Sequence, residues 1–69
     1  MTRRAELLHL RIQHALRQCR LHRFNASLIR TDPVGARASQ GYSYYPTAAL
    51  REHQRDLVGY RRDRQAVQP

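Results

Sequence analysis

This chain has few of the residues that small proteins use to stabilise a fold covalently or with large rings. Its 69 residues include one cysteine, one phenylalanine and no tryptophan. A single cysteine, Cys19, excludes a disulfide within one chain. Chains of this length bury little core unless a disulfide, a metal or a partner adds stability. We therefore expect a protein that depends on partners and is not a free-standing monomer.

Lysine is also absent, and acidic residues are scarce. All 13 cationic side chains are arginine, against five acidic ones, which gives a formal net charge of +8. A GC-rich coding bias can produce such a composition, but the chemical properties of the arginines do not depend on its origin. The planar guanidinium binds phosphates and carboxylates through paired hydrogen bonds and stacks on bases. The composition indicates binding to nucleic acid, an anionic membrane surface or an acidic protein.

Long apolar runs are missing too. We expect no transmembrane segment and no secretory signal, because no continuous apolar stretch has the required length. The first 24 residues are instead amphipathic, arginine-rich and poor in acid, as mitochondrial targeting segments are. We expect a mitochondrial protein, in the matrix or on the matrix side of the inner membrane, with an uncleaved N-terminal targeting-like helix. A basic helix without a targeting role is the alternative.

Residues 2–24 contain no glycine or proline and carry apolar residues at helical spacing, which predicts one amphipathic helix. Thr2 is placed to cap its start and Asn25 to end it. The helix has two apolar stripes on opposite faces, so one small neighbour cannot cover both. The first stripe contains Ala5, Leu8, Ile12, Ala15, Leu16 and Cys19, and the second contains Leu7, Leu10 and Leu21.

The remainder predicts a connector and a second helix. Residues 25–45 are largely unpatterned around a turn signal at Thr31–Gly35, so we expect an extended irregular connector. Residues 46–64 return to helical spacing after Pro46, and residues 65–69 form a tail. Neither helix shows a heptad repeat long enough to predict a coiled coil. The predicted fold is a single all-α chain over residues 1–69, with two amphipathic arginine-rich helices, a long irregular connector and little independent core.

Three groups of side chains are candidates for contact with partners. Arginines are expected to bind rRNA phosphates or acidic partners, aliphatic residues to dock on neighbouring subunits, and tyrosines to stack on bases or to anchor the connector. The arginines are Arg11, Arg17, Arg20, Arg51, Arg55, Arg61 and Arg62; the docking residues are Leu8, Ile12, Leu16, Leu50 and Leu57; the tyrosines are Tyr42, Tyr44 and Tyr45.

Catalysis and metal binding have little support in the sequence. Cys19 and His22 are spaced as ligands on one helical face can be, and His9, His14 or His53 could join them. Specific zinc motifs consist of two pairs of closely spaced ligands, and a chain with one cysteine does not supply such a pattern. No nucleophile–base set, glycine-rich phosphate loop or carboxylate pair is visible. We expect a non-enzymatic protein without cofactor or metal, in which Cys19 is a small core residue.

A family resemblance follows from the order of several elements. A basic stretch opens at Ala15–Arg17, two aromatic residues precede Pro-Thr at Tyr44–Thr47, and an arginine-rich helix ends near Tyr60–Arg62. This order resembles ribosomal protein twenty-one, a short, basic, two-helix family of the bacterial-type small ribosomal subunit with mitochondrial versions. The resemblance implies no enzymatic activity and a position on rRNA near the platform of the small subunit. It also implies backbone contacts by Arg17, Arg51, Arg55, Arg61 and Arg62.

These features predict a non-catalytic structural subunit of a large mitochondrial multiprotein complex. The first expectation is an organellar ribosomal protein whose arginines contact rRNA phosphates and whose apolar stripes dock on protein neighbours. The alternative is an accessory subunit of a respiratory-chain complex or ATP synthase, because the first helix is unusually apolar for an rRNA-threading peptide. A basic helix pair on an anionic membrane surface is a third option.

Overall fold

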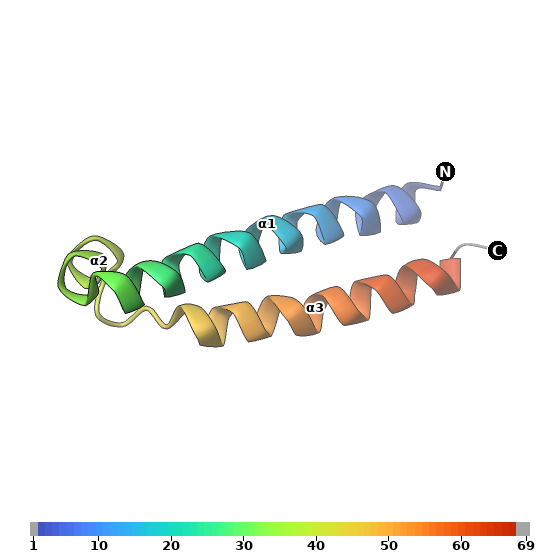
Figure 1. Ribbon diagram of the computed structural model, residues 1–69. Helices are drawn as coiled ribbons and strands as arrows, with labels where there is room; N and C mark the ends of the chain where they lie inside the picture. Colours follow the sequence, from blue (N-terminus) through green and yellow to red (C-terminus); the bar gives the residue numbers. More distant parts are fainter. Residues whose placement is uncertain (1, 68–69) are drawn as a thin grey trace.

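The structure, a computed structural model, describes residues 2–67, which form three α-helices and no strand. α1 spans Arg3–Thr31, α2 spans Pro33–Gln40 and α3 spans Pro46–Val67. α1 and α3 lie side by side and antiparallel, so that both chain ends are at one end of the molecule and α2 is at the other (Figure 1). The prediction of an all-α fold is confirmed.

The molecule is a rod. Its principal extents are 50 × 17 × 16 Å, and its radius of gyration is 15.3 Å. A compact domain of this length would have a radius of gyration of about 11 Å. A rod that is two helices wide puts few side chains out of reach of water. Within residues 2–67, no side chain falls below 2 % exposure.

α1 begins as predicted but extends further. Thr2 caps it, because its hydroxyl accepts a hydrogen bond from the Ala5 N–H at 3.1 Å. The predicted end near residue 24 is wrong, since Asn25 lies inside the helix and its side chain donates to the Tyr44 hydroxyl at 3.1 Å. The helix stops at Asp32, because the following Pro33 has no N–H and restricts the residue before it.

The predicted irregular connector is mostly helical. Residues 25–31 complete α1 and residues 33–40 form α2, so only residues 41–45 connect α2 to α3 without regular structure. The expected turn at Asp32–Pro33 is a helix start, in which the Asp32 carboxylate accepts from the Gly35 N–H at 3.2 Å. α2 ends at Gly41, whose φ of 96° suits glycine and whose N–H donates to the Arg37 carbonyl at 2.9 Å.

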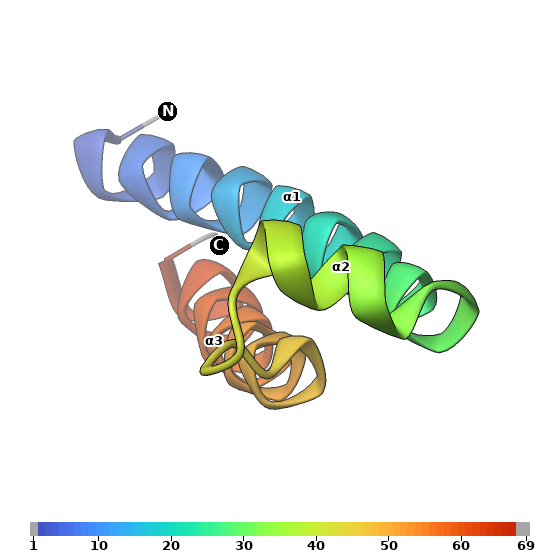
Figure 2. The same cartoon turned by 90° about the vertical axis from the view of Figure 1, so that its left-hand side faces the viewer.

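α3 also exceeds its predicted length. It continues through Val67, so the predicted tail at 65–69 begins as helix, and residues 68–69 lie outside the described residues. α2 packs beside the C-terminal half of α1 (Figure 2). Ala36 is the buried residue of α2. Both α2 and α3 therefore pack against α1.

Burial along the two long helices follows a heptad pattern. On α1 the buried residues alternate three and four positions apart, as along a coiled-coil seam. The buried and half-buried residues of α3 include a series with the same spacing. On α1 these are Ala5, Leu8, Ile12, Ala15, Cys19 and His22, and on α3 they are Pro46, Leu50, His53, Leu57, Tyr60, Arg64 and Val67. The sequence showed no heptad repeat long enough to predict a coiled coil, because alanine, cysteine and histidine occupy places where leucine or isoleucine marks such a repeat.

A small apolar core fills the middle of this seam. Buried Ile12, Ala15 and Cys19 of α1 meet Leu57 of α3, and Leu16, Leu50 and Tyr60 pack against the group. Cys19 is a buried free thiol in this core, as its position on the first stripe predicts. The small side chains at 15 and 19 leave space for the larger groups of α3, Leu57 and Tyr60, in the same cluster.

Candidate functional site

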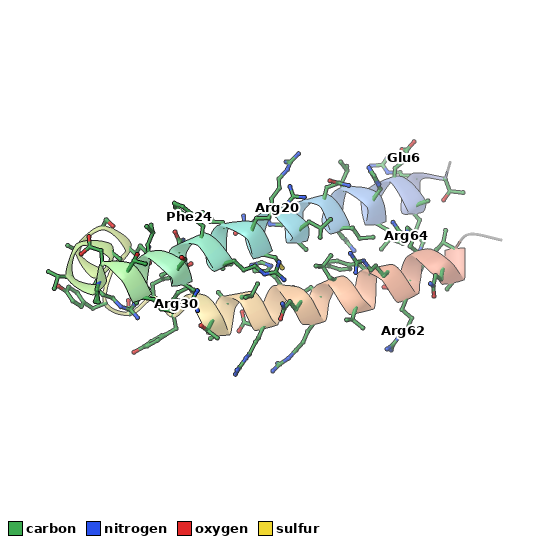
Figure 3. The ribbon with its side chains drawn as sticks, in the orientation of Figure 1. Glu6, Arg20, Phe24, Arg30, Arg62 and Arg64 are labelled. Atoms are coloured by element: carbon green, nitrogen blue, oxygen red, sulfur yellow. The ribbon has the colours of Figure 1, made fainter. Side chains whose placement is uncertain are left out.

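Arginine dominates the surface. Eleven of the thirteen arginines are exposed, and only Arg37 and Arg64 are half-buried. Figure 3 shows Arg20 of α1 directed away from α3, and Arg62 of α3 directed away from α1. Cationic groups therefore occupy opposite sides of the rod instead of a single patch. The exposed set includes every arginine predicted to contact an anionic partner: Arg11, Arg17, Arg20, Arg51, Arg55, Arg61 and Arg62.

Two shallow grooves lie between α1 and α3, and they differ in charge. The first, here named the acid-free groove, has a volume of about 460 Å³, contains three arginines and has an apolar floor. Its walls carry no carboxylate. The residues that line it are Leu16, Cys19, Arg20, Arg23, Gln54, Leu57, Val58 and Arg61.

The second, here named the acid-containing groove, consists of two hollows of about 390 Å³ and about 290 Å³ that share Arg11. It also contains three arginines, but Asp63 borders one hollow and Asp56 the other. Its lining comprises Arg3, Arg4, Leu7, Leu8, Arg11, His14, Ala15, His53, Asp56, Tyr60 and Asp63. An anion that enters this groove meets carboxylates as well as guanidinium groups.

A polar cluster closes the helix seam near the α2 end. Buried His22 stacks on His53 of α3, with ring centroids 5.3 Å apart and ring planes 15° apart. The Tyr44 hydroxyl accepts from the Asn25 side chain at 3.1 Å and is hydrogen-bonded to Nδ1 of His22. The ring of His14 meets His53 edge-on at 6.4 Å. The cluster thus connects α1, the 41–45 connector and α3.

The charge state of His22 follows from this environment. Burial lowers the pKa of His22 below its ordinary 6.5, and charge repulsion from His53 lowers it further. His22 is therefore neutral at pH 7, and its Nδ1 can accept a hydrogen bond from the Tyr44 hydroxyl. Protonation would remove this acceptor and place a positive charge in the seam.

Arg37 holds the connector at the end of α2. Its guanidinium donates to the Tyr44 carbonyl and, at 3.4 Å, to the Gly41 carbonyl. It also lies 5.7 Å from the centre of the Tyr45 ring, within cation–π range. Of the three tyrosines expected to stack or anchor, Tyr44 is tied into the fold, whereas Tyr42 and Tyr45 remain exposed.

The aliphatic residues expected to dock on partners lie mostly inside the chain. Leu8, Ile12 and Leu57 are buried, and Leu16 and Leu50 are half-buried against the core. This corrects the expectation of a free docking face, because α3 itself covers the first apolar stripe of α1. The second stripe is different: it stays exposed, and Phe24 extends it. Its exposed members are Leu7, Leu10, Leu21 and Phe24.

Sequence reasoning missed the polar cluster and the role of Arg37. The signal for part of the cluster was present, since His22 continues the three–four spacing of Ala15 and Cys19, and His53 lies on the corresponding seam of α3. Extending the heptad past Cys19 would have paired the two histidines. No pattern in the sequence marks Arg37, because its contacts depend on the fold of the connector.

Within residues 2–67, no three His, Cys, Asp or Glu side chains are grouped so as to hold a metal ion. None of the described helices is both long and apolar enough to cross a bilayer. Comparison with protein-family models, with curated proteins and with solved structures finds no match to this chain. A functional interpretation of this chain therefore rests on its own geometry.

Proposed function

We propose that this protein is a non-catalytic structural subunit of a large mitochondrial assembly, in the first place an organellar ribosome, in which its arginines bind rRNA phosphates. The observation that carries the proposal is the exposure of all seven candidate arginines on a rod 50 Å long. Cations on opposite sides suit a position between RNA segments, where phosphate contacts fix orientation without reading sequence. An anionic surrounding also relieves the mutual repulsion of a chain with net charge +8.

The acid-free groove is the most favourable place on this surface for a phosphate to bind. Arg20, Arg23 and Arg61 line it, Arg20 with its side chain directed away from α3 (Figure 3), and no carboxylate in the lining competes for their hydrogen bonds. Gln54 adds an amide that can donate to a sugar or base. Its apolar floor suits an unstacked base, such as those in single-stranded loops, bulges and ends of RNA.

The mitochondrial location rests on the N-terminal half of α1. Residues 2–24 combine an amphipathic pattern with six arginines and the single acid Glu6. In the structure this segment is helical from Arg3 and exposes its arginines, a form that suits recognition of a targeting segment.

Sedimentation tests the proposal. A tagged chain expressed in cells should co-sediment with a mitochondrial ribosomal subunit, and ribonuclease or high salt should release it. With purified protein and single-stranded RNA, the logarithm of the binding constant should fall with the logarithm of salt concentration, with a slope of roughly −5 if all seven arginines contact phosphates. Sedimentation that ribonuclease and salt leave unchanged would exclude RNA as the partner.

One observation favours a second candidate, an accessory subunit of a respiratory-chain complex or ATP synthase. The exposed stripe of Leu7, Leu10, Leu21 and Phe24 offers apolar contact that RNA phosphates do not require. For this candidate, the chain should migrate with a membrane complex on a native gel in detergent, and nuclease should not release it. The two experiments together separate the candidates.

A further inference from the structure

α1 carries a second seam with the spacing of the one that α3 fills. The second seam, here named the outer seam, also alternates three and four positions and is centred on the face opposite the buried residues. Leu7 and His14 lie at its edge, where they also line the acid-containing groove. Its apolar members expose large fractions of their surface: 45 % for Leu7, 62 % for Leu10, 48 % for Leu21 and 62 % for Phe24. Figure 3 shows Phe24 on the side of α1 that faces away from α3. The outer seam consists of Leu7, Leu10, His14, Arg17, Leu21 and Phe24.

We propose that the outer seam binds an acidic amphipathic helix of a partner protein, which packs along α1 on the side away from α3. Alternating three–four spacing is the pattern by which one straight helix packs along another. Leu7 and Leu10 form one apolar pair, Leu21 and Phe24 form another, and Arg17 lies between them as a polar position, whereas His14, at the edge of the seam, meets His53 of α3 edge-on. A single polar layer in an apolar seam sets the register of the partner.

Charge determines which helix fits. Arg17 lies on the outer seam itself, Arg11 and Arg20 flank it on either side, and all three are exposed. Glu6 is the only acid in residues 2–24. A second copy of the chain would bring these cations against their own equivalents, each copy with a net charge of +8. A partner with a carboxylate opposite Arg17 and acids along its edges is complementary instead.

An anionic bilayer fits this face less well. Helices that lie in a membrane interface bury one continuous apolar face. Arg17 interrupts the outer seam at its centre, where hydrocarbon would offer it no partner but a helix can offer a carboxylate. From Leu7 to Phe24 the outer seam is about 26 Å long at the helical rise per residue, and the next position in the spacing, Leu28, is already half-buried. The free face thus matches one short helix.

This inference does not rest on RNA binding by the acid-free groove, although Arg20 borders both surfaces, and one set of variants separates the two. The double variant L10S/L21S removes apolar contacts from the outer seam without touching the acid-free groove. RNA affinity should therefore be unchanged in this variant whether or not the outer seam binds a helix. Failure of either proposal then leaves the other standing.

Binding to a designed peptide tests the inference. The probe is a fluorescent helical peptide of about 20 residues, with leucine at heptad seam positions, glutamate at flanking positions and one glutamate in its central seam layer. Fluorescence anisotropy with the full chain should show binding that L10S/L21S weakens by about tenfold or more. The control is V34S/V58S, which changes two exposed apolar residues elsewhere, 78 % and 59 % exposed, and should leave the affinity unchanged. Circular dichroism checks that each variant stays helical.

A charge swap tests the register. Arg17→Glu should weaken binding of the peptide, and a peptide with arginine at its central layer should restore binding to this variant but bind the unaltered chain poorly. Arg62→Glu is the matched control, because it changes the net charge equally on a side chain directed away from α1 (Figure 3). For Arg62→Glu, exchanging the central residue of the peptide should restore nothing.

Each alternative occupant has its own readout. Peptide binding that L10S/L21S leaves unchanged would overturn the inference in favour of unspecific charge attraction. Binding of phosphatidylserine vesicles that depends on Leu10 and Leu21, without peptide binding, would overturn it in favour of a membrane surface. A dimer in sedimentation equilibrium that L10S/L21S dissociates would overturn it in favour of a second copy of the chain.

Discussion

The acid-free and acid-containing grooves are built by the same two helices and contain the same number of arginines, yet their charge differs. Three arginines without a carboxylate give the acid-free groove a formal charge of +3. Three arginines with Asp56 and Asp63 give the acid-containing groove 3 − 2 = +1. Because three arginines line each groove, the carboxylates determine which groove is expected to bind an anion more strongly.

Helix geometry explains why the acids gather on one side. Asp56 and Asp63 are seven residues apart, which is two helical turns, so both face the same groove. Gln54 and Arg61 have the same separation and face the other groove. A heptad period in the polar residues of α3 therefore accompanies the heptad period of its seam.

The largest effect on stability is expected at Leu57, the buried α3 residue of the core between the two helices. Leu57→Ala should lower the free energy of unfolding by about 2–5 kcal/mol, because it leaves a cavity in the small core that joins α1 and α3. Such a loss is enough to abolish both grooves in a protein with so little core. Chemical denaturation followed by circular dichroism measures it.

Val58 is the matched control for this change. It neighbours Leu57 on α3 but exposes 59 % of its surface, so Val58→Ala should change the free energy of unfolding by no more than about 0.5 kcal/mol. If Leu57→Ala proved as stable as Val58→Ala, the seam between α1 and α3 would not be what holds the rod together. The comparison of grooves would then lose its structural basis.

A pair of triple variants tests the charge difference directly. R20Q/R23Q/R61Q empties the acid-free groove of cations, and R3Q/R4Q/R11Q empties the acid-containing groove, with the same change in net charge. The first should reduce affinity for single-stranded RNA by about tenfold more than the second at low salt, and should lower the salt slope further. Anisotropy titrations at several salt concentrations measure both quantities. Equal losses would mean that only total charge matters and that neither groove is a preferred site.

The sequence predicted the parts of this fold that depend on local signals. The Thr2 cap, the helical start of α1 and the all-α class each follow from spacing and capping within a few residues. The end of α1 did not follow, because Asn25 is held inside the helix by Tyr44, nineteen positions away. Asp32–Pro33 reads equally well as a turn or as a helix cap, and contacts of α2 with α1 decide between them.

The candidate site was predictable to a similar degree. Exposure of the arginines follows from their charge, since unpaired charged side chains are almost never buried. Their division between two grooves did not follow, because it depends on how α1 and α3 are rotated about their axes. That rotation is fixed by the seam, which was hard to recognise with Ala15, Cys19 and His22 at positions where larger apolar residues are usual.

The smallest expected effect concerns pH and the end of the seam where His22 stacks on His53. The pKa of His22 is lowered in the folded chain, so below its unfolded value of 6.5 the unfolded chain binds more protons than the folded one. The free energy of unfolding should be constant above about pH 6.5 and should fall as pH decreases from there toward the folded-state pKa. Thermal unfolding at a series of pH values from about 7.5 to about 5 measures this decline, in a range where carboxylates contribute little.

Two variants test whether the fall in the free energy of unfolding at low pH comes from the polar cluster around His22 or from any histidine of the chain. His22→Gln should flatten the pH dependence, because it removes the buried group that loses its acceptor role on protonation. His9→Gln, which changes an exposed histidine of the same helix, should leave the decline in place. His53 stacks on His22 and also lines the acid-containing groove, so this titration links the seam to one groove and not to the other. A decline that persists in His22→Gln but disappears in His9→Gln would place the responsible proton outside the seam and remove that link.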